Sequence, residues 1–288
     1  MKKRIITGLV ALTSMVSSAA AQDIYRTAAN VPMVQLNNGI LMPQFGLGTF
    51  FQPSDSVCEQ SCLTALKAGY RHIDTAHAYN DEAGVGRAVK ESGIPREEIW
   101  ITSKLWPTEY GEGKTLKAID EMLRRLQLDY IDLLYVHQSA GDFVGARKDM
   151  EKAEAMGKVR VLGISDSDAS DEVFDKIMRE SVVKPAVLQM ECHPYAQRLA
   201  MREKAKRYGI YVTSWFPLGG AMSKGALLKE ERFFNMSLEE KERAYLGNMQ
   251  IPAEGSDYVR KDIRSERSAS LSGGTGLYGY EPRIRCAS

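Results

Sequence analysis

The sequence predicts an α/β fold, a parallel (β/α)8 barrel of the TIM type that lacks a recognisable eighth strand. Short apolar runs alternate with segments of helical periodicity, the pattern of a parallel sheet covered by helices. Polar or ionisable residues end several of these runs, and strand ends converge on one face of such a barrel. The chain has 288 residues, with an apolar fraction of 44% and a charged fraction of 26%. Its length and composition therefore suit one globular barrel.

The N-terminal segment, residues 1–21, has the parts of a secretory signal peptide. A basic stretch at residues 2–4 precedes an apolar stretch at residues 5–16, and small residues lead to Ala21. We expect an exported, periplasmic protein, or a cytoplasmic one if this leader is not functional. A buried N-terminal helix is the alternative. The apolar stretch is shorter than the ~20 residues of a membrane span, so no membrane association is expected after leader removal.

Strands and helices then alternate along the chain. Asn37-Asn38-Gly39 indicates a hairpin between two short apolar strands. The first long helix ends at Gly69, a residue that commonly stops helices. The clearest helix, Lys114–Leu126, carries apolar side chains at helical spacing. The predicted strands are 45–49, 72–75, 99–105, 131–136, 159–164, 186–190 and 210–215. The predicted helices are 56–68, 82–92, 114–126, 146–156, 170–179 and 199–208.

The alternation stops after Leu228. Residues 229–246 are charged and predict a helical remnant, whereas residues 247–288 are rich in Gly, Ser and Arg and are typical of a loop or a disordered tail. No run supplies a convincing eighth strand, so the first and seventh strands would expose unpaired backbone edges. The barrel is therefore predicted to span residues 32–228 with seven recognisable strands.

Composition and spacing argue against several other kinds of site. A net charge of +1 gives no reason to expect nucleic acid as a partner. No two histidines have the spacing of metal ligands, so no metal is expected. Cys58 and Cys62, four residues apart on a predicted helix, are expected to be buried free thiols. Gly84-Val-Gly86 lacks the third glycine of a nucleotide-binding fingerprint and indicates a helix start. We expect a monomer.

Four polar residues at or just past strand ends, Asp74, Tyr79, Lys104 and His137, form the candidate catalytic quartet. Carbonyl reduction by hydride needs a proton donor, and a tyrosine hydroxyl with its ordinary pKa of ~10 is a poor one near neutrality. A nearby lysine ammonium is expected to lower that pKa. A carboxylate can hold the lysine, and a neutral histidine can orient the carbonyl. Each residue alone more often has a structural role, but their order at successive strand ends favours a site.

These residues lie in motifs that resemble the aldo-keto reductase family, in particular its bacterial diketogluconate-reductase-like members. The resemblance covers about residues 32–228 and implies that Tyr79 is the general acid, with the rest of the quartet completing a tetrad. It also implies a small aldehyde or ketone substrate and NADPH as cofactor, with NADH as the alternative. The motifs include Gly69-Tyr-Arg-His-Ile-Asp-Thr-Ala, Thr102-Ser-Lys-Leu-Trp, Tyr130-Ile-Asp-Leu-Leu-Tyr-Val-His and Gln189-Met-Glu-Cys-His-Pro-Tyr.

The same resemblance implies a cofactor-binding set of six residues. Ser165, Asp166 and Gln189 would contact the carboxamide of the nicotinamide. Trp215 would stack on the nicotinamide ring, and the backbone of Leu218 and Gly219 would approach the pyrophosphate. The set comprises Ser165, Asp166, Gln189, Trp215, Leu218 and Gly219. Asp166 stands where the family usually has Asn, and a carboxylate cannot donate to the carboxamide oxygen. Glu191 is either a cofactor-pocket residue or a packed polar group.

The departure after Leu228 leaves two other functions open. Relatives continue there with an eighth strand and with basic residues that bind the adenosine 2′-phosphate. Without them the chain would be an impaired or non-catalytic remnant of the family. The leader suggests a third function, an exported carbonyl- or sugar-binding protein.

Overall fold

The structure is a computed structural model that describes residues 31–165, 171–194 and 196–218. The predictions for residues 1–21, 229–246 and 247–288 lie outside this part of the chain, as do Asp166 and Gly219. The chain divides into two compact units. The first comprises Met1–Met190 and Ala200–Thr213, and the second comprises Glu191–Leu199 and Ser214–Ser288.

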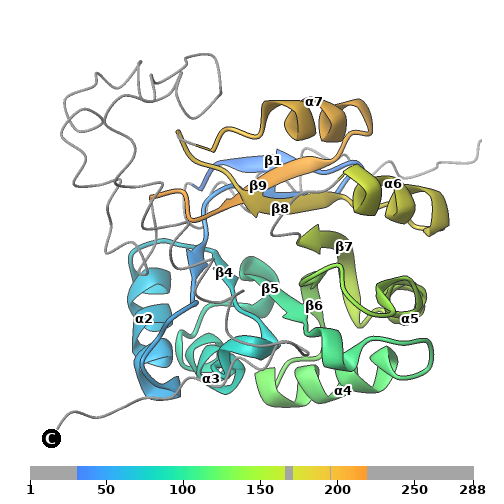
Figure 1. The fold of residues 1–288 in the computed structure, drawn as a ribbon. Helices are drawn as coiled ribbons and strands as arrows, with labels where there is room; N and C mark the ends of the chain where they lie inside the picture. Colours follow the sequence, from blue (N-terminus) through green and yellow to red (C-terminus); the bar gives the residue numbers. More distant parts are fainter. Residues whose placement is uncertain (1–30, 166–170, 195, 219–288) are drawn as a thin grey trace, which may run out of the picture. The chain divides into compact units, whose positions relative to one another are not determined.

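A parallel sheet of seven strands, ordered as in the sequence from β3 to β9, forms the centre of the fold (Figure 1). Each predicted strand has a counterpart, and the ends differ from the prediction by at most two residues. The strands are β3 (Leu47–Gly48), β4 (His72–Asp74), β5 (Trp100–Leu105), β6 (Ile131–Val136), β7 (Val159–Ser165), β8 (Val187–Glu191) and β9 (Tyr211–Trp215). A separate antiparallel hairpin pairs β1 (Met33–Gln35) with β2 (Leu41–Pro43), as the Asn-Asn-Gly turn predicts.

Helices connect successive strands of the sheet. Ser54 caps the first of them by accepting a hydrogen bond from the Val57 backbone N–H at 3.2 Å. The helix predicted to begin at residue 146 begins at Phe143 instead, because Asp142 accepts from the Gly145 N–H at 2.9 Å and caps it there. The helices are α2 (Asp55–Lys67), α3 (Glu82–Glu91), α4 (Thr115–Leu126), α5 (Phe143–Ala155), α6 (Asp171–Glu180) and α7 (Leu199–Arg207), with short 3-10 helices η1 (His77–Tyr79), η2 (Arg96–Glu98) and η3 (Pro107–Glu109). No helix in the described ranges is long and apolar enough to cross a bilayer.

Contacts across the sheet show that it curves into a nearly closed barrel. Asp74 on β4 and Gln189 on β8 lie four strands apart, which is about 19 Å in a flat sheet. Yet the Gln189 Nε2 donates to the Asp74 Oδ2 at 2.7 Å. Tyr135 on β6 and Thr213 on β9 likewise meet, with 3.2 Å between their hydroxyl oxygens. The inward side chains of β4, β6, β8 and β9 therefore share one interior, as in a (β/α)8 barrel.

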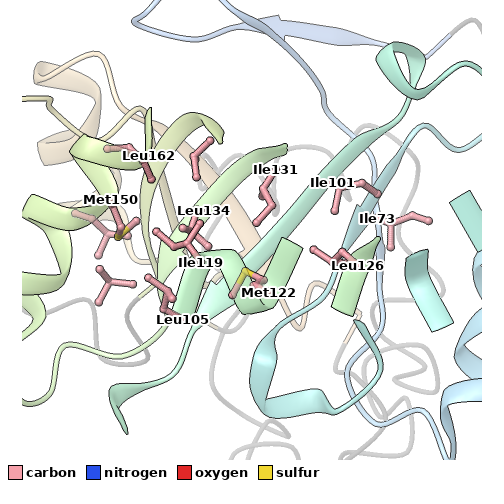
Figure 2. Packing of buried hydrophobic residues seen from close by; sticks show 14 of the residues in the cluster. Ile73, Ile101, Leu105, Ile119, Met122, Leu126, Ile131, Leu134, Met150 and Leu162 are labelled. Carbon is pink, nitrogen blue, oxygen red and sulfur yellow. The ribbon is translucent and has the colours of Figure 1, made fainter. Parts of the chain in front are cut away.

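Alternate residues of each strand enter different layers of the core. On β6, Leu134 and Val136 pack in the large cluster between the sheet and helices such as α4 and α5 (Figure 2). Leu133 and Tyr135 point the other way, into a second cluster that includes Trp100. All four side chains are buried. This period of two explains why an internal strand reads as a continuous apolar run.

The glycines of Gly84-Val-Gly86 serve helix packing. A Cβ added to Gly84 would lie 2.3 Å from the carbonyl oxygen of Asp55 on α2. One added to Gly86 would lie 2.0 Å from the carbonyl oxygen of Leu126 at the end of α4. Both distances are too short for any side chain, so the two glycines let α3 approach its neighbours. The prediction that this segment belongs to a helix is confirmed.

Candidate active site

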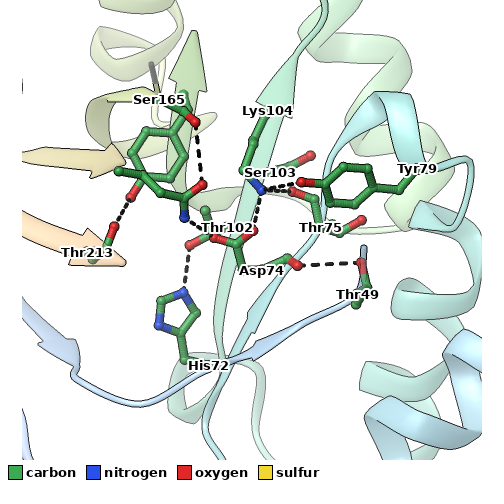
Figure 3. A network of polar contacts seen from close by, with 12 residues as sticks. Thr49, His72, Asp74, Thr75, Tyr79, Thr102, Ser103, Lys104, Ser165 and Thr213 are labelled. Carbon is green, nitrogen blue, oxygen red and sulfur yellow. Dashed lines mark hydrogen bonds and ion pairs between the residues drawn. The ribbon is translucent and has the colours of Figure 1, made fainter. Parts of the chain in front are cut away.

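The polar residues predicted for the site in the first unit gather at the carboxyl ends of the strands. Asp74 is the last residue of β4, Lys104 lies near the end of β5, and His137 directly follows β6. Ser165 ends β7, and Gln189 lies in β8. Because the strands are parallel, these ends meet at the same edge of the barrel. Figure 3 shows Asp74, Lys104 and Ser165 converging there with Tyr79.

Lys104 is the centre of the polar network. Its ammonium donates to the Asp74 Oδ1, to the Thr75 carbonyl at 2.9 Å and to the Tyr79 hydroxyl at 3.3 Å (Figure 3). These three bonds use all three ammonium protons. The side chain is 2% exposed, so its charge depends on Asp74 for compensation. No sequence signal points to Thr75, because it contributes a backbone acceptor.

The surroundings of Lys104 stabilise its charged form. Burial opposes the charge, but Asp74 and Tyr79 outweigh it, and the pKa of Lys104 lies above its ordinary value. The ammonium is therefore charged at neutral pH. A charged lysine is what the predicted site requires.

The prediction of a lowered pKa for Tyr79 is wrong in its net direction. Burial of the phenol is the largest effect and raises its pKa above the ordinary value. Lys104 does lower this pKa, while Asp74 raises it. The phenol is consequently protonated at neutral pH and can act as a proton donor. Its ring also contacts Phe50, with 4.9 Å between the ring centroids.

His137 is a neutral imidazole beside Tyr79. Its ring meets the Tyr79 ring edge-on at 5.8 Å between centroids and the Trp106 ring at 5.3 Å. Burial, with the nearby charge of Lys104, lowers the pKa of His137 to about 3. Its backbone N–H donates to the Tyr110 hydroxyl at 2.9 Å. The ring Nδ1 is buried and has no hydrogen-bond partner within the described residues, which leaves a polar atom for a bound molecule.

Ser165 and Gln189 have hydrogen-bonding capacity left for a carboxamide. The Ser165 hydroxyl donates to the Gln189 Oε1 at 3.5 Å, and the Gln189 Nε2 donates to Asp74 at 2.7 Å. An amide has two donor hydrogens and two acceptor lone pairs, so one of each remains on Gln189 beside these contacts. The residues present in this unit therefore fit the nicotinamide group that the sequence resemblance implies.

The second unit contains the remaining described residues of the predicted cofactor set. Trp215 packs edge-on against Phe216 with 5.2 Å between the ring centroids, and Leu218 is 47% exposed. Asp166 and Gly219 lie outside the described residues. The cofactor roles of these four residues stay predictions.

Glu191 is a packed polar group of the second unit. It is 4% exposed. The His193 Nε2 lies 3.2 Å from its Oε1, and the Arg198 Nη2 lies 3.4 Å from its Oε2. Of the two alternatives left open for Glu191, these contacts favour the structural one. Across the part of the chain that the structure describes, no cluster of three His, Cys, Asp or Glu side chains is placed to hold a metal ion.

Sequence comparisons identify relatives over most of the chain. A profile of the Aldo/keto reductase family matches residues 44–270, beyond the residue 228 at which the predicted barrel ends. A Trypanosoma cruzi protein named 9,11-endoperoxide prostaglandin H2 reductase is 38% identical over 199 residues, which is 69% of this chain and 70% of the relative. The glyoxal reductase of Bacillus subtilis is 39% identical over 199 residues, with the same coverage of both chains.

Solved structures give the same result. An aldo/keto reductase from Brucella melitensis superposes with a TM-score of 0.64 at 30% identity, covering 81% of this chain and 99% of that one. A Bombyx mori aldo-keto reductase in complex with NADP superposes with a TM-score of 0.61 at 25% identity, covering 81% of this chain and 92% of that one. The placement among diketogluconate-reductase-like members is not tested by these matches and stays a prediction.

Proposed function

The chain belongs to the aldo/keto reductase family of NAD(P)H-dependent oxidoreductases, and on this premise we propose that it reduces small aldehydes or ketones to alcohols with NADPH. The observation that carries the proposal is the Lys104 ammonium, which donates to Asp74, to the Thr75 carbonyl and to the Tyr79 hydroxyl. This arrangement joins a buried, compensated cation to a protonated phenol. It suits protonation of an oxygen on which negative charge develops.

Tyr79 is the proposed general acid. A reduced nicotinamide held by Ser165 and Gln189 would be the source of hydride for the carbonyl carbon. Negative charge then grows on the carbonyl oxygen, and the Tyr79 hydroxyl gives it a proton, which leaves a phenolate. Lys104, 3.3 Å from that oxygen, stabilises the phenolate, because an opposite charge at this range favours the ionised form. Asp74 keeps Lys104 charged and directs it.

His137 is proposed to orient the substrate. With a pKa of about 3 it is neutral at neutral pH. A neutral imidazole can donate one hydrogen bond to a carbonyl oxygen without adding charge. Its ring and that of Phe50 contact the Tyr79 ring, and Trp106 packs against the His137 ring. These aromatic rings beside the phenol favour a small carbonyl compound. The Bacillus subtilis relative is named a glyoxal reductase, so glyoxal is a rational first substrate.

The cofactor assignment rests on the family and on two residues of the first unit. Ser165 and Gln189 would hold the carboxamide with the donor and acceptor that their mutual contacts leave free. The Bombyx mori neighbour is a complex with NADP, which supports NADPH over NADH. The predicted contributions of Asp166, Trp215 and the Leu218-Gly219 backbone belong to the same proposal.

The test uses the purified full chain. NADPH absorbance is followed with glyoxal and a panel of small aldehydes and ketones, and the thermal midpoint is measured with NADPH and with NADH. We expect carbonyl-dependent NADPH oxidation and a midpoint raised more by NADPH, because a ligand that binds only the folded state stabilises it, by ~2.7 kcal/mol at 100 times its Kd.

Two other results would reject the proposal. A midpoint raised by NADPH without any turnover would identify a remnant that binds cofactor but does not react. Binding of a carbonyl compound or sugar that is indifferent to cofactor, with no midpoint shift from NADPH, would favour the exported binding protein.

A further inference from the structure

The loop that carries Tyr79 is closed by a buried hydrogen bond between its two ends. The Thr75 hydroxyl donates to the Asp81 Oδ1 at 2.5 Å. Thr75 is fully buried and Asp81 is 2% exposed. Between them lie η1, which ends at Tyr79, and Asn80 in the left-handed conformation with φ 56° and ψ 32°. Tyr79 therefore lies within a short closed loop rather than at the end of a free one.

The same threonine contacts Lys104. Its carbonyl accepts from the Lys104 Nζ at 2.9 Å, and its N–H donates to the Thr102 carbonyl at 2.9 Å. All three polar groups of Thr75 are thus engaged, with Asp81, Lys104 and Thr102 as partners. A change in the Thr75–Asp81 bond would displace both the loop that holds Tyr79 and the carbonyl that receives Lys104.

Helix capping does not account for the Asp81 carboxyl group. Asp81 occupies the N-cap position of α3, where an aspartate usually accepts a backbone hydrogen bond. Its side chain makes no such bond. Burial raises the pKa of Asp81, and the Thr75, Thr49 and Cys58 side chains lower it. A buried carboxyl group is costly to the fold, so its contact with Thr75 needs a different explanation.

We propose that Asp81 is a positioning residue that, through Thr75, holds the Tyr79 hydroxyl and the Lys104 ammonium at their working separation. The inference rests on the proposed function, because it concerns the same proton transfer. Asp81 positions these groups by fixing the loop and the carbonyl of Thr75. Its negative charge has a separate electrostatic effect on the Tyr79 pKa, which it raises.

The test separates the hydrogen bond from the charge. Thr75→Val removes the donor, Thr75→Ser restores it, and Asp81→Asn keeps an acceptor oxygen while removing the charge. We expect Thr75→Val to lower kcat about tenfold, the effect of one well-placed hydrogen bond, with little change in the KM for NADPH. Thr75→Ser should recover most of kcat, and Asp81→Asn should keep kcat within about threefold of the parent.

The pH profile supplies a second readout. The charged groups that face Tyr79 are Lys104, Asp74 and Asp81, and the negative charge of Asp81 raises the Tyr79 pKa. In Asp81→Asn the alkaline limb that reports Tyr79 should therefore move to lower pH, while in Thr75→Ser it should stay in place. Ser92→Ala, which removes a hydroxyl bond of 2.7 Å to the Val89 carbonyl at the far end of α3, should change neither kcat nor the profile.

A readout without turnover keeps the inference independent of the proposed function. In protein with 13C-labelled tyrosine, the Tyr79 ring carbon resonance is assigned by its loss in Tyr79→Phe, and Thr75→Val should shift it. If the parent chain reduces no carbonyl, the proposed function fails while this measurement still tests Asp81. An unchanged resonance and kcat in folded Thr75→Val would overturn the inference, as would an Asp81→Asn defect as large as that of Thr75→Val.

Discussion

The two ends of the barrel each hold an aspartate beside basic side chains, yet the two clusters are built differently. At the carboxyl ends of the strands Asp74 pairs with Lys104, which is 2% exposed and also donates to the Tyr79 hydroxyl. At the amino ends Asp132, 1% exposed, pairs with Arg96 and Arg160, whose side chains are 20% and 35% exposed. Both carboxylates are compensated. Only the first cluster ends on a group that can transfer a proton.

The Asp132 carboxylate accepts hydrogen bonds on both of its oxygens. Arg96 and Arg160 each donate to one of its carboxylate oxygens at 2.7 Å, and the Ile101 backbone N–H donates at 2.9 Å. Arg96 also stacks over the Tyr130 ring at 4.1 Å. Arginine is always protonated and binds carboxylates through a planar fork, so this arrangement ties β5, β6 and β7 together. It has a structural role and no titratable donor.

The candidate catalytic cluster differs from the structural one in its basic residue and in the groups that this residue contacts. In the first cluster the basic residue is a lysine, a compact charge that shares its protons with three acceptors. One acceptor is a protonated phenol, and a histidine atom without a partner lies nearby. The first cluster therefore has groups that can bind a substrate and give it a proton. Four substitutions test how the two clusters differ in function.

The largest expected effect is on turnover in Tyr79→Phe. Loss of the general acid should lower kcat by about 10³-fold, within the usual range for acid–base groups. The thermal midpoint should stay close to that of the parent, because the ring and its contact with Phe50 remain. The rate of NADPH oxidation gives kcat, and thermal unfolding gives the midpoint. Retained activity would remove Tyr79 from its assigned role.

Lys104→Met should affect both turnover and stability. We expect kcat to fall by about 10²-fold and the free energy of unfolding by at most about 3–5 kcal/mol, because Asp74, whose side chain is 17% exposed, loses its charged partner. The double variant Lys104→Met/Asp74→Asn is the control. It should regain much of the stability but none of the activity, and regained activity would contradict the role of the lysine.

His137 should make stability depend on pH. Its pKa is lowered from 6.5 to about 3 on folding, so the unfolded chain binds a proton that the folded chain does not. Stability is then fully present above about pH 6.5 and is lost as pH falls toward 3, by up to about 4–5 kcal/mol. Denaturant unfolding across this window should show a weaker pH dependence in His137→Asn than in the parent. Equal slopes would show that His137 is not buried as neutral imidazole.

The smallest expected effect belongs to the structural cluster. Asp132→Asn should lower the free energy of unfolding by about 1–3 kcal/mol, since two partly exposed arginines lose a charged acceptor. The kcat per folded molecule should match the parent. Denaturant titration measures the free energy of unfolding, and kinetics normalised to the concentration of folded protein measure kcat. A large loss of kcat would show that the two ends of the barrel are coupled.

Much of this fold is readable from the sequence because local patterns and tertiary contacts agree. The strand Ile131–Val136 has the predicted bounds, since its continuous apolar run is buried on both faces. The apolar spacing predicts that α5 begins at residue 146, but the helix begins at Phe143, because Asp142 caps it upstream of that spacing. Cys58 and Cys62 are buried free thiols, as predicted.

The candidate site was less completely readable. The residue types at successive strand ends indicated Asp74, Tyr79, Lys104 and His137. The Thr75 carbonyl left no trace in the sequence, because every residue has one. Asp81 directly precedes the predicted helix 82–92, and its side-chain partner Thr75 is known only from the fold.

The order of strands and helices, the residues of the quartet and the surrounding family motifs can all be read from the amino-acid sequence. These follow from apolar periodicity and from residue types at strand ends, both of which are local. The balance of energies within the site depends on the folded arrangement of the chain. Burial outweighs the Lys104 charge and raises the Tyr79 pKa, and curvature of the sheet joins Gln189 to Asp74 across four strands. Both depend on distances between segments remote in the sequence, which no local pattern records.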